Sequence, residues 1–357
     1  MAAFTAVDDP SANFKVQLYT GDGTAIGAGG KAVVFDDTDT NMQPDLVWVK
    51  DRDAANSHNL CDVVRGVTKN LYLDADAAEG TDVERLASFN SDGFTVGDNT
   101  SWNDDGHDYV AWCWRTQGGA GSSNTTGSIN TTSTSVNTTS GFSISTYTGT
   151  GASATIGHGL GAVPKFLLIK LRDASDGDWV TWISPMVVDG RIYANSTAVK
   201  TSDTDFMDST LPSSTIITLG SAGHVNGDGR AFVCYAAAAV QGFSKFGIYI
   251  GNGNADGPFV YTGFKPAFVI GTNTTNDGNH WFIVDNKRPG YNGGSNWIKG
   301  DLAAAELTNL VSPDFLSNGF KIRNSNAIYN TSGSEFVYAA FAETPLVNSN
   351  GVPCNAR

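Results

Sequence analysis

The stretch Tyr19-Thr-Gly-Asp-Gly23 gives the first indication of the fold. Its pattern returns as Tyr147-Thr-Gly-Thr-Gly151 and Tyr249-Ile-Gly-Asn-Gly253. In each place a short run rich in apolar residues leads into the tyrosine, and two glycines follow it. We interpret the pattern as a β-strand that ends in a tight turn, since glycine adopts positive φ at no steric cost. A landmark that recurs with the same chemistry indicates an internal repeat.

Two further landmarks follow each copy in the same order. A proline opens an apolar run at Pro44, Pro164 and Pro266, and the tyrosine-to-proline separation is 17 in copies two and three but 25 in copy one. Each copy then closes with an aromatic-rich run: 109–114, 232–237 and 336–341. Proline donates no ladder hydrogen bond and is tolerated at the first residue of a strand. We therefore predict that the three prolines open equivalent strands.

These landmarks predict an all-β protein of three tandem antiparallel β-sandwich domains of about 100 residues each, with short helical turns only. A helical period appears weakly at 75–86 and 301–310. Of the 25 residues in 117–141, 21 are Gly, Ser, Thr or Asn, a composition that favours an extended or mobile, protease-sensitive linker. The expected divisions are an arm (1–12), repeat 1 (13–117), a linker (118–140), repeat 2 (141–241), repeat 3 (242–346) and a tail (347–357).

Composition excludes several classes of protein. The chain has 22 Lys and Arg against 36 Asp and Glu, a formal net charge of −14, which disfavours nucleic acid and acidic membrane surfaces as partners. No apolar run approaches the roughly 18 residues of a membrane-spanning helix. The four cysteines are scattered without a Cys-x-x-Cys pair, so we expect small buried side chains and neither disulfides nor a zinc site: Cys61, Cys113, Cys234 and Cys354.

The search for chemistry assigns no catalytic residue and no cofactor other than calcium. The five histidines are dispersed, and the Gly-x-Gly turns lack the third glycine and the helix of a dinucleotide site. Paired acids for sugar hydrolysis have no fixed spacing, so that alternative stays open. Two loops place hard oxygen ligands close together, which suits calcium, although solvated turns are the alternative: Asp36, Asp37 and Asp39, and Asp104 and Asp105.

Two groups of aromatic residues indicate contacts beyond a single sandwich core. Trp102 and Trp297 follow polar stretches, where an exposed ring would stack on a sugar or pack against another subunit. Trp112 and Trp114 share one face of the closing strand with Val110, more aromatic surface than one thin core needs. Either both faces of that strand are covered, or one face meets another chain.

The chain resembles a family of tailed-phage virion proteins, abundant in phages of marine bacteria and cyanobacteria, that carry tandem copies of a β-rich domain. The resemblance covers nearly the whole chain and is carried by stretches such as Val7-Asp-Asp-Pro10, Met42-Gln-Pro-Asp-Leu-Val-Trp-Val-Lys50, Gly251-Asn-Gly-Asn-Ala-Asp-Gly-Pro-Phe-Val-Tyr-Thr-Gly-Phe264 and Tyr338-Ala-Ala-Phe-Ala-Glu343.

This family is labelled tail-fibre-like, and the resemblance implies a non-catalytic structural protein of the virion, assembled in the host cytoplasm. As a tail fibre or tail-associated adhesin it would contribute to host attachment. The expected partners are other virion proteins, the chain itself as a homotrimer, and a host surface glycan. A head-decoration or neck protein is the first alternative, and a surface-glycan depolymerase is the second.

Overall fold

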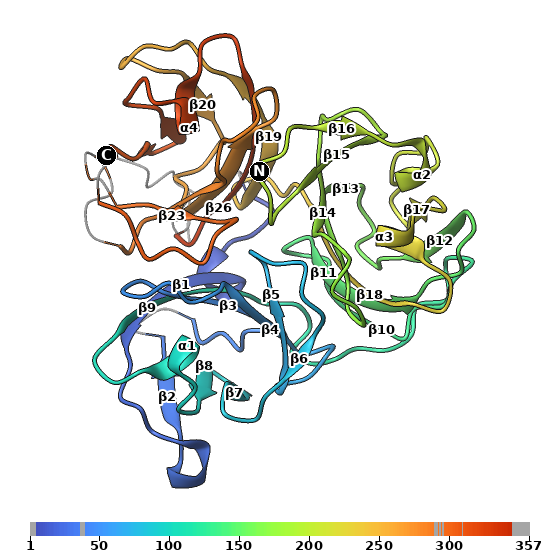
Figure 1. Cartoon of the computed structure of the whole chain (residues 1–357), viewed down its shortest axis with the longest axis horizontal. Coiled ribbons are helices and arrows are strands. Elements are labelled where there is room, and N and C mark those ends of the chain that lie inside the picture. The colour runs from blue at the N-terminus through green and yellow to red at the C-terminus, as the bar shows by residue number, and fades with distance from the viewer. Residues whose placement is uncertain are drawn as a thin grey trace.

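The structure is a computed structural model that describes residues 5–35, 40–288, 292, 294, 296–308 and 310–344. Three β-sandwich repeats stand as three lobes around a common centre (Figure 1). Each repeat has one large antiparallel sheet, which faces the centre, and one small sheet on its outer side. The all-β class is confirmed.

The large sheets share one strand order, in which the strand with the repeated tyrosine lies beside the closing strand, and the closing strand lies beside the strand that follows the proline. Repeat 1 has β1 (Phe14–Thr20), β9 (Asp108–Trp114), β3 (Leu46–Asp51), β4 (Asn59–Asp62), β5 (Lys69–Tyr72) and β6 (Gly80–Thr81). Repeat 2 has β10 (Ser133–Asn137), β11 (Phe142–Thr148), β18 (Ala231–Ala238), β13 (Pro164–Leu171), β14 (Val180–Ile183), β15 (Gly190–Tyr193) and β16 (Thr201–Ser202). Repeat 3 has β19 (Ser244–Ile250), β26 (Glu335–Phe341), β21 (Phe268–Asn273), β22 (Phe282–Asp285) and β23 (Ile298–Lys299).

The small sheets and the helical turns complete each sandwich. The small sheets are β2 (Lys31–Val34), β8 (Gly93–Val96) and β7 (Leu86–Asn90); β12 (Ala154–Gly157) and β17 (Ile216–Leu219); and β20 (Phe259–Tyr261), β25 (Gly319–Lys321) and β24 (Asp314–Leu316). The helices are η1 (Pro10–Ala12), η2 (Ile26–Ala28), α1 (Thr100–Asn103), α2 (Thr204–Met207), α3 (Gly223–Asn226) and α4 (Ala327–Asn330). The weak helical periods at 75–86 and 301–310 form no helix among the described residues there, so that indication was wrong.

The strand orders bear out the internal repeat. The strands β3, β13 and β21 are equivalent, because each pairs with the closing strand of its repeat. Pro164 is the first residue of β13, and Pro44 and Pro266 stand two residues before β3 and β21. The prolines stand at equivalent positions, since each lies two residues before an equivalent register position: Leu46, Phe166 and Phe268. Only Pro164 opens its strand as predicted, while Pro44 and Pro266 precede theirs.

The tyrosine of the repeated pattern has the same role in each copy. It stacks on the aromatic residue opposite it in the closing strand, and its hydroxyl donates a hydrogen bond to a carbonyl of the helical turn before that strand. The stacked pairs are Tyr19 and Tyr109 (centroids 5.0 Å apart), Tyr147 and Phe232 (5.2 Å), and Tyr249 and Phe336 (4.9 Å). The accepting carbonyls belong to Trp102 (2.7 Å), Val225 (2.6 Å) and Tyr329 (2.8 Å).

The two glycines of the pattern answer two different steric demands. A side chain on Gly21, Gly149 or Gly251 would collide with a backbone carbonyl beyond the helical turn. The second glycine of each pair has positive φ, +64° at Gly23 and +69° at both Gly151 and Gly253. The positive φ predicted for the turn is therefore confirmed at the second position, and close backbone approach explains the first.

The segment predicted as a linker, 118–140, is part of repeat 2. Residues Ser133–Asn137 form β10, which pairs with β11, and Ile129 forms a β-bridge to Ile156 of β12. The prediction of a free spacer was wrong because Ser and Thr hydroxyls bond to neighbouring segments, as Thr131 does to the backbone N–H of Asn124 at 2.7 Å. A composition with little to bury is thus ordered by side-chain hydrogen bonds to backbone.

The aromatic faces of the large sheets meet at the centre of the molecule. The ring of Trp114 in repeat 1 lies 6.2 Å from that of Phe142 in repeat 2 and 5.6 Å from that of Phe268 in repeat 3, between centroids. Of the two alternatives for the closing strand, the first holds: Trp112 and Trp114 are covered within the chain. The homotrimer stays a prediction that rests on the resemblance.

The three repeats close into a ring, and we call its interfaces seam 1–2, seam 2–3 and seam 3–1 after the repeats that they join. At one equivalent position in each seam, a ring N–H donates to a backbone carbonyl of the neighbouring repeat. The pairs are Trp179 Nε1 to Tyr72 (2.7 Å), Trp281 Nε1 to Tyr193 (2.9 Å) and His58 Nε2 to Lys299 (2.9 Å). His58 donates through Nε2 because its Nδ1 accepts from Trp48 Nε1 at 3.0 Å.

Seams 1–2 and 3–1 each contain a buried ion pair. In seam 1–2, Arg65 Nε lies 2.6 Å from Asp62 Oδ2, and the hydroxyl of Tyr235 in repeat 2 donates to the same carboxylate at 2.7 Å. In seam 3–1, Arg288 Nε lies 2.7 Å from Asp285 Oδ2, which also accepts from Trp112 Nε1 of repeat 1 at 3.1 Å.

Each of these pairs extends to the rim of the ring through a glutamate. Glu79 binds Arg65 and, in repeat 2, Arg172; Glu306 binds Arg288 and, in repeat 1, Arg52. Every buried charge named in these two seams thus has a partner, as burial away from water requires.

Seam 2–3 has different chemistry at the same positions. Register places Ile183 where the other seams have the aspartate, and Ala339 where they have Tyr235 and Trp112. Met186 follows Ile183 by three residues, as each arginine follows its aspartate. Ile183, Met186 and Ala339 all belong to the central apolar core. At the rim, Lys200 takes the place of the glutamate and pairs with Glu335 at 2.8 Å.

Candidate functional site

The two tryptophans predicted as exposed contacts are buried. Trp102 is 0% exposed and Trp297 is 3% exposed, so both predictions were wrong. Trp102 lies in α1, which packs onto the inner core of repeat 1, while the polar neighbour Asn103 turns inward and accepts the backbone N–H of Asp22 at 2.8 Å. Polar neighbours in the sequence therefore did not mark an exposed loop.

The predicted calcium ligands give no assembled site among the described residues. Asp36, Asp37 and Asp39 lie outside the described residues. Asp104 and Asp105 follow α1, and the Asp104 carboxylate lies 3.6 Å from His107 Nε2. The described part of the chain contains no group of three or more His, Cys, Asp or Glu placed to hold a metal ion. Calcium at either loop stays a prediction.

The thiols are structural. Cys61, Cys113 and Cys234 are buried and free, as predicted, and burial raises the pKa of Cys61 and Cys234 to about 12. A thiol with a raised pKa is a poor nucleophile because the thiolate is the reactive form. Cys354 lies outside the described residues.

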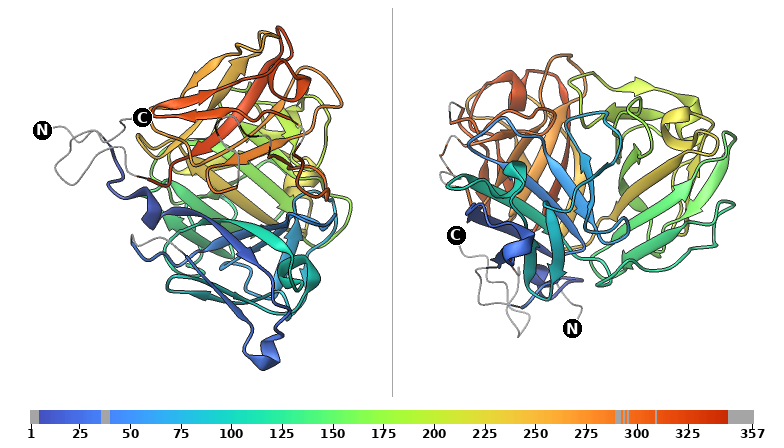
Figure 2. Two further views of the ribbon diagram at one scale, coloured as in Figure 1. Left: turned by 90° about the vertical axis from the view of Figure 1, so that its left-hand side faces the viewer. Right: turned by 60° about the horizontal axis from the view of Figure 1, so that its bottom comes forward.

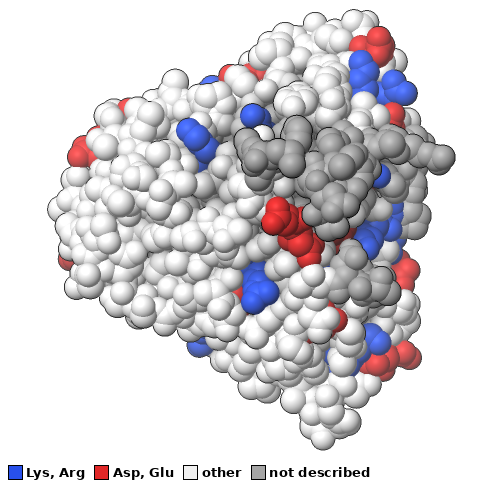
Figure 3. All heavy atoms as spheres, turned by 180° about the vertical axis from the view of Figure 1, so that it is seen from behind, with Lys and Arg blue, Asp and Glu red and all other residues white. Residues whose placement is uncertain are grey.

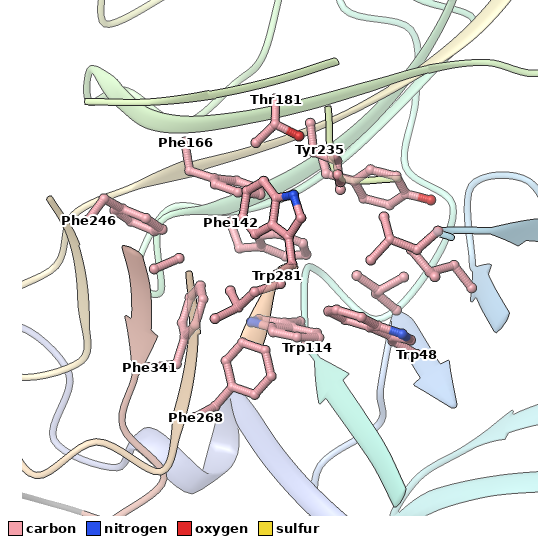
Figure 4. Close-up of a pocket in the computed structure, with 17 residues that line it drawn as sticks. Trp48, Trp114, Phe142, Phe166, Thr181, Tyr235, Phe246, Phe268, Trp281 and Phe341 are labelled. Atoms are coloured by element: carbon pink, nitrogen blue, oxygen red, sulfur yellow. The ribbon is translucent and has the colours of Figure 1, made fainter. Parts of the chain in front are cut away.

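A cavity of about 70 Å³ lies where the three repeats meet (Figure 4). Its labelled aromatic side chains come from all three large sheets and point toward one another across the centre. The lining residues are Leu46, Trp48, Leu60, Leu73, Trp114, Phe142, Phe166, Leu168, Thr181, Ala194, Tyr235, Phe246, Phe268, Ile270, Trp281, Ala339 and Phe341. The lining has no carboxylate, imidazole, amine or thiol, and the hydroxyl of its one tyrosine, Tyr235, donates to Asp62 in seam 1–2, so the cavity is an apolar space.

Two hydrogen-bonded histidine–aspartate pairs lie near the surface, and in a third, looser pair His224 Nε2 lies 3.7 Å from Asp203 Oδ2. His107 Nδ1 lies 3.0 Å from Asp51 Oδ2, and the hydrogen bond to Asp51 raises the pKa of His107. His280 Nδ1 lies 2.8 Å from Asp301 Oδ2. Among the described residues, neither ring donates to or accepts from a hydroxyl or thiol through Nε2, the contact that would mark a nucleophile activated by a base. We interpret both pairs as structural.

The outer face of one small sheet carries exposed aromatic side chains. On β20 of repeat 3, Phe259 is 45% exposed and Tyr261 is 62% exposed, while Val260 between them is buried. Leu316 on β24 is 37% exposed. We call this surface the β20 face. Sequence analysis missed it, although the alternation Phe-Val-Tyr between Gly257 and Gly263 is typical of a half-buried strand.

Charge is sparse on the side of the ring that Figure 3 shows. Figure 3 shows the side opposite to that of Figure 1, where Lys and Arg side chains stand singly or beside Asp and Glu and form no continuous basic area. The first and last described segments come out on this same side of the ring (Figure 2). None of the helices in the described part of the chain has the length and apolar character needed to cross a membrane.

Comparison with known proteins gives a family and no function. No curated protein and no solved structure matches the chain. The family match begins at residue 9 and ends at residue 345, so it takes in all three repeats together. The family unit is therefore the whole ring rather than one sandwich. The chain belongs to the family described as a domain of unknown function, DUF7483, which matches residues 9–345.

Proposed function

We propose that this protein is a non-catalytic structural component of a virion, of the tail-fibre type, and that it contributes to attachment to the host. The observation that carries the proposal is how the chain uses its reactive side chains. The buried acids, arginines and His58 hold the seams together, and the central cavity is lined without a carboxylate, imidazole, amine or thiol. A ring of this kind supplies a stiff body with separate outer surfaces, which suits attachment better than chemistry.

The resemblance to tail-fibre-like virion proteins supports the setting, and the β20 face supports the attachment role. An exposed aromatic pair on one repeat is a contact surface, because large exposed apolar side chains are unfavourable in water unless a partner covers them.

Labelled electron microscopy of the virion tests the proposal. Antibodies against the purified chain should bind at the tail, and the purified chain should compete with virions for adsorption to host cells. Label on the head or neck would favour a decoration protein instead. Release of reducing ends from host polysaccharide by the purified chain would favour a depolymerase and overturn the non-catalytic proposal.

A further inference from the structure

The three repeats present the same outer strand with different side chains. The strands β2, β12 and β20 are equivalent, because each follows the Tyr-x-Gly-x-Gly turn and pairs with the strand of the small sheet that precedes the closing helical turn. The residues that flank the buried central position are Ala32 and Val34 in repeat 1, Thr155 and Gly157 in repeat 2, and Phe259 and Tyr261 in repeat 3. Only repeat 3 has aromatic residues at these positions.

The strand register arranges the β20 face in two rows. Tyr261 pairs with Gly319, which pairs with Leu316, so a glycine separates the two apolar side chains. In the next row, Phe259 pairs with Lys321, which pairs with Asp314. Gly319 has no side chain of its own, and the ring of Phe259 lies beside it.

Each of the two aromatic rings lies beside a glycine. A side chain on Gly319 would stand 3.0 Å from the ring carbons of Phe259. A side chain on Gly263 would stand 3.5 Å from the Tyr261 hydroxyl and 3.7 Å from the nearest ring carbon. Each ring therefore lies close to bare glycine backbone on its inner side. The exposed fractions of 45% and 62% leave much of each ring facing solvent.

Two ion pairs border the β20 face. Lys321 Nζ lies 2.7 Å from Asp256 Oδ1, and Arg323 Nε lies 2.7 Å from Asp314 Oδ2. Each pair is neutral overall, and the exposed Lys245 lines the hollow beside Tyr261. The paired groups suit a neutral ligand better than an ion, and their polar atoms remain able to exchange hydrogen bonds with hydroxyl groups.

The size of the face argues against a protein partner. An aromatic side chain has about 150–250 Å² of surface, so the exposed parts of Phe259, Tyr261 and Leu316 amount to roughly 300 Å². A stable protein interface needs about 800 Å² on each partner. A sugar ring is of the right size, because its C–H groups lie against the negative face of an aromatic ring while its hydroxyls reach polar groups at the edge.

We propose that the β20 face binds a neutral pyranose unit of a polysaccharide, by stacking on Tyr261 and Phe259 and by hydrogen bonds to Asp256 and Lys321. This proposal rests on the attachment role proposed above for its biological setting. Binding is measurable without the virion, so the two proposals can fail separately.

The test is affinity electrophoresis of the full chain through gels that contain one polysaccharide each. The probes are the neutral polymers dextran, laminarin and hydroxyethyl cellulose and the anionic polymers alginate and carrageenan. At least one neutral polymer should retard the wild-type chain. The Tyr261→Ala variant should bind that polymer about tenfold more weakly, since loss of one stacked ring and its buried area amounts to one or two kcal/mol. Tyr261→Trp should restore binding.

The matched control is Val34→Ala, because Val34 occupies the equivalent exposed position in repeat 1. This variant should leave binding unchanged, and both alanine variants should melt at the wild-type temperature. Retardation by none of the neutral polymers, by the anionic polymers alone, or equally for wild type and Tyr261→Ala would overturn the proposal. So would a dimer in sedimentation that Tyr261→Ala abolishes, since a second copy would then be the occupant. Tail labelling without polysaccharide binding would leave the attachment role standing.

Discussion

Seams 1–2 and 3–1 contain buried ion pairs at positions where seam 2–3 contains apolar side chains, although all three seams come from one repeated pattern. The aspartate and arginine of repeats 1 and 3 meet Tyr235 and Trp112, both of which donate a hydrogen bond to the buried carboxylate. Repeat 3 offers Ala339 at the equivalent position, which can donate none, and repeat 2 correspondingly has Ile183.

The apolar and the polar residues of the seams have different roles: the first stabilise the contact between repeats, and the second select which repeats are neighbours. The apolar interior common to the three seams supplies most of the favourable free energy, in proportion to the area removed from water. A buried carboxylate adds little net stability but penalises any neighbour that leaves it without a donor. The polar positions therefore specify which repeat stands beside which, since a charged repeat is compatible only with a neighbour that has Tyr or Trp.

The largest effect should come from breaking one ion pair in seam 3–1. Arg288→Met leaves the buried carboxylate of Asp285 without its cation and should lower the free energy of unfolding by about 3–5 kcal/mol. The double variant Asp285→Ile with Arg288→Met gives repeat 3 the residues that repeat 2 has at these two positions, Ile183 and Met186, and should recover part of that loss. Urea unfolding of both variants measures the difference. A double variant that is less stable than the single one would contradict the comparison.

Acid should weaken seam 3–1 through His58, which occupies the position of a tryptophan in the other seams. Burial, together with the nearby Lys50, lowers the pKa of His58 to about 3. Between that value and about 6.5 the unfolded chain binds a proton that the folded chain does not, so stability falls as pH falls. The slope approaches about 1.4 kcal/mol per pH unit below pH 6, and the loss from pH 6.5 to 4.5 should be roughly 2 kcal/mol.

The His58→Gln variant isolates this contribution from the carboxylates and from the other histidines. Its unfolding free energy should decrease less steeply between pH 6.5 and 4.5 than that of the wild type, in denaturant titrations at each pH. Parallel pH profiles for the two proteins would show that His58 is not responsible.

A small effect is expected at the rim of seam 2–3. The Lys200–Glu335 pair is partly exposed, with side chains 30% and 27% accessible, so Lys200→Met should cost only about 0.2–1 kcal/mol. Glu79→Gln, at the equivalent rim position of seam 1–2, removes a carboxylate that contacts both Arg65 and Arg172 and should cost more. Equal losses in thermal unfolding would mean that the two rims are equivalent in energy.

The smallest change is expected from cutting the chain between repeats 1 and 2. Residues 120–123 are exposed, so a specific protease site inserted between Ser122 and Ser123 should be cleaved in the folded protein. Because two seams hold repeat 1, the two fragments should elute together in gel filtration and separate only in urea. Separation without denaturant would show that the seams are weaker than their contacts indicate.

The repeat, the strand content and the chemistry of the turns could be predicted from the sequence. These features are readable because they depend on residues close in the chain: the alternation of apolar side chains along a strand, the glycines of the Tyr-x-Gly-x-Gly turn and the prolines before β3, β13 and β21. The same local logic predicted the buried positions of Cys61, Cys113 and Cys234.

Which surfaces are buried depends on the tertiary structure and could not be predicted from the sequence. Trp102 stands among polar residues in the chain but packs into a core, and Tyr261 belongs to an ordinary strand pattern but faces solvent. The segment 118–140 has a linker composition yet completes a sheet. In each case burial depends on segments that are distant in the sequence, and the ring brings such segments together. The contacts between repeats join residues that are far apart in the sequence, so no local sequence pattern predicts them.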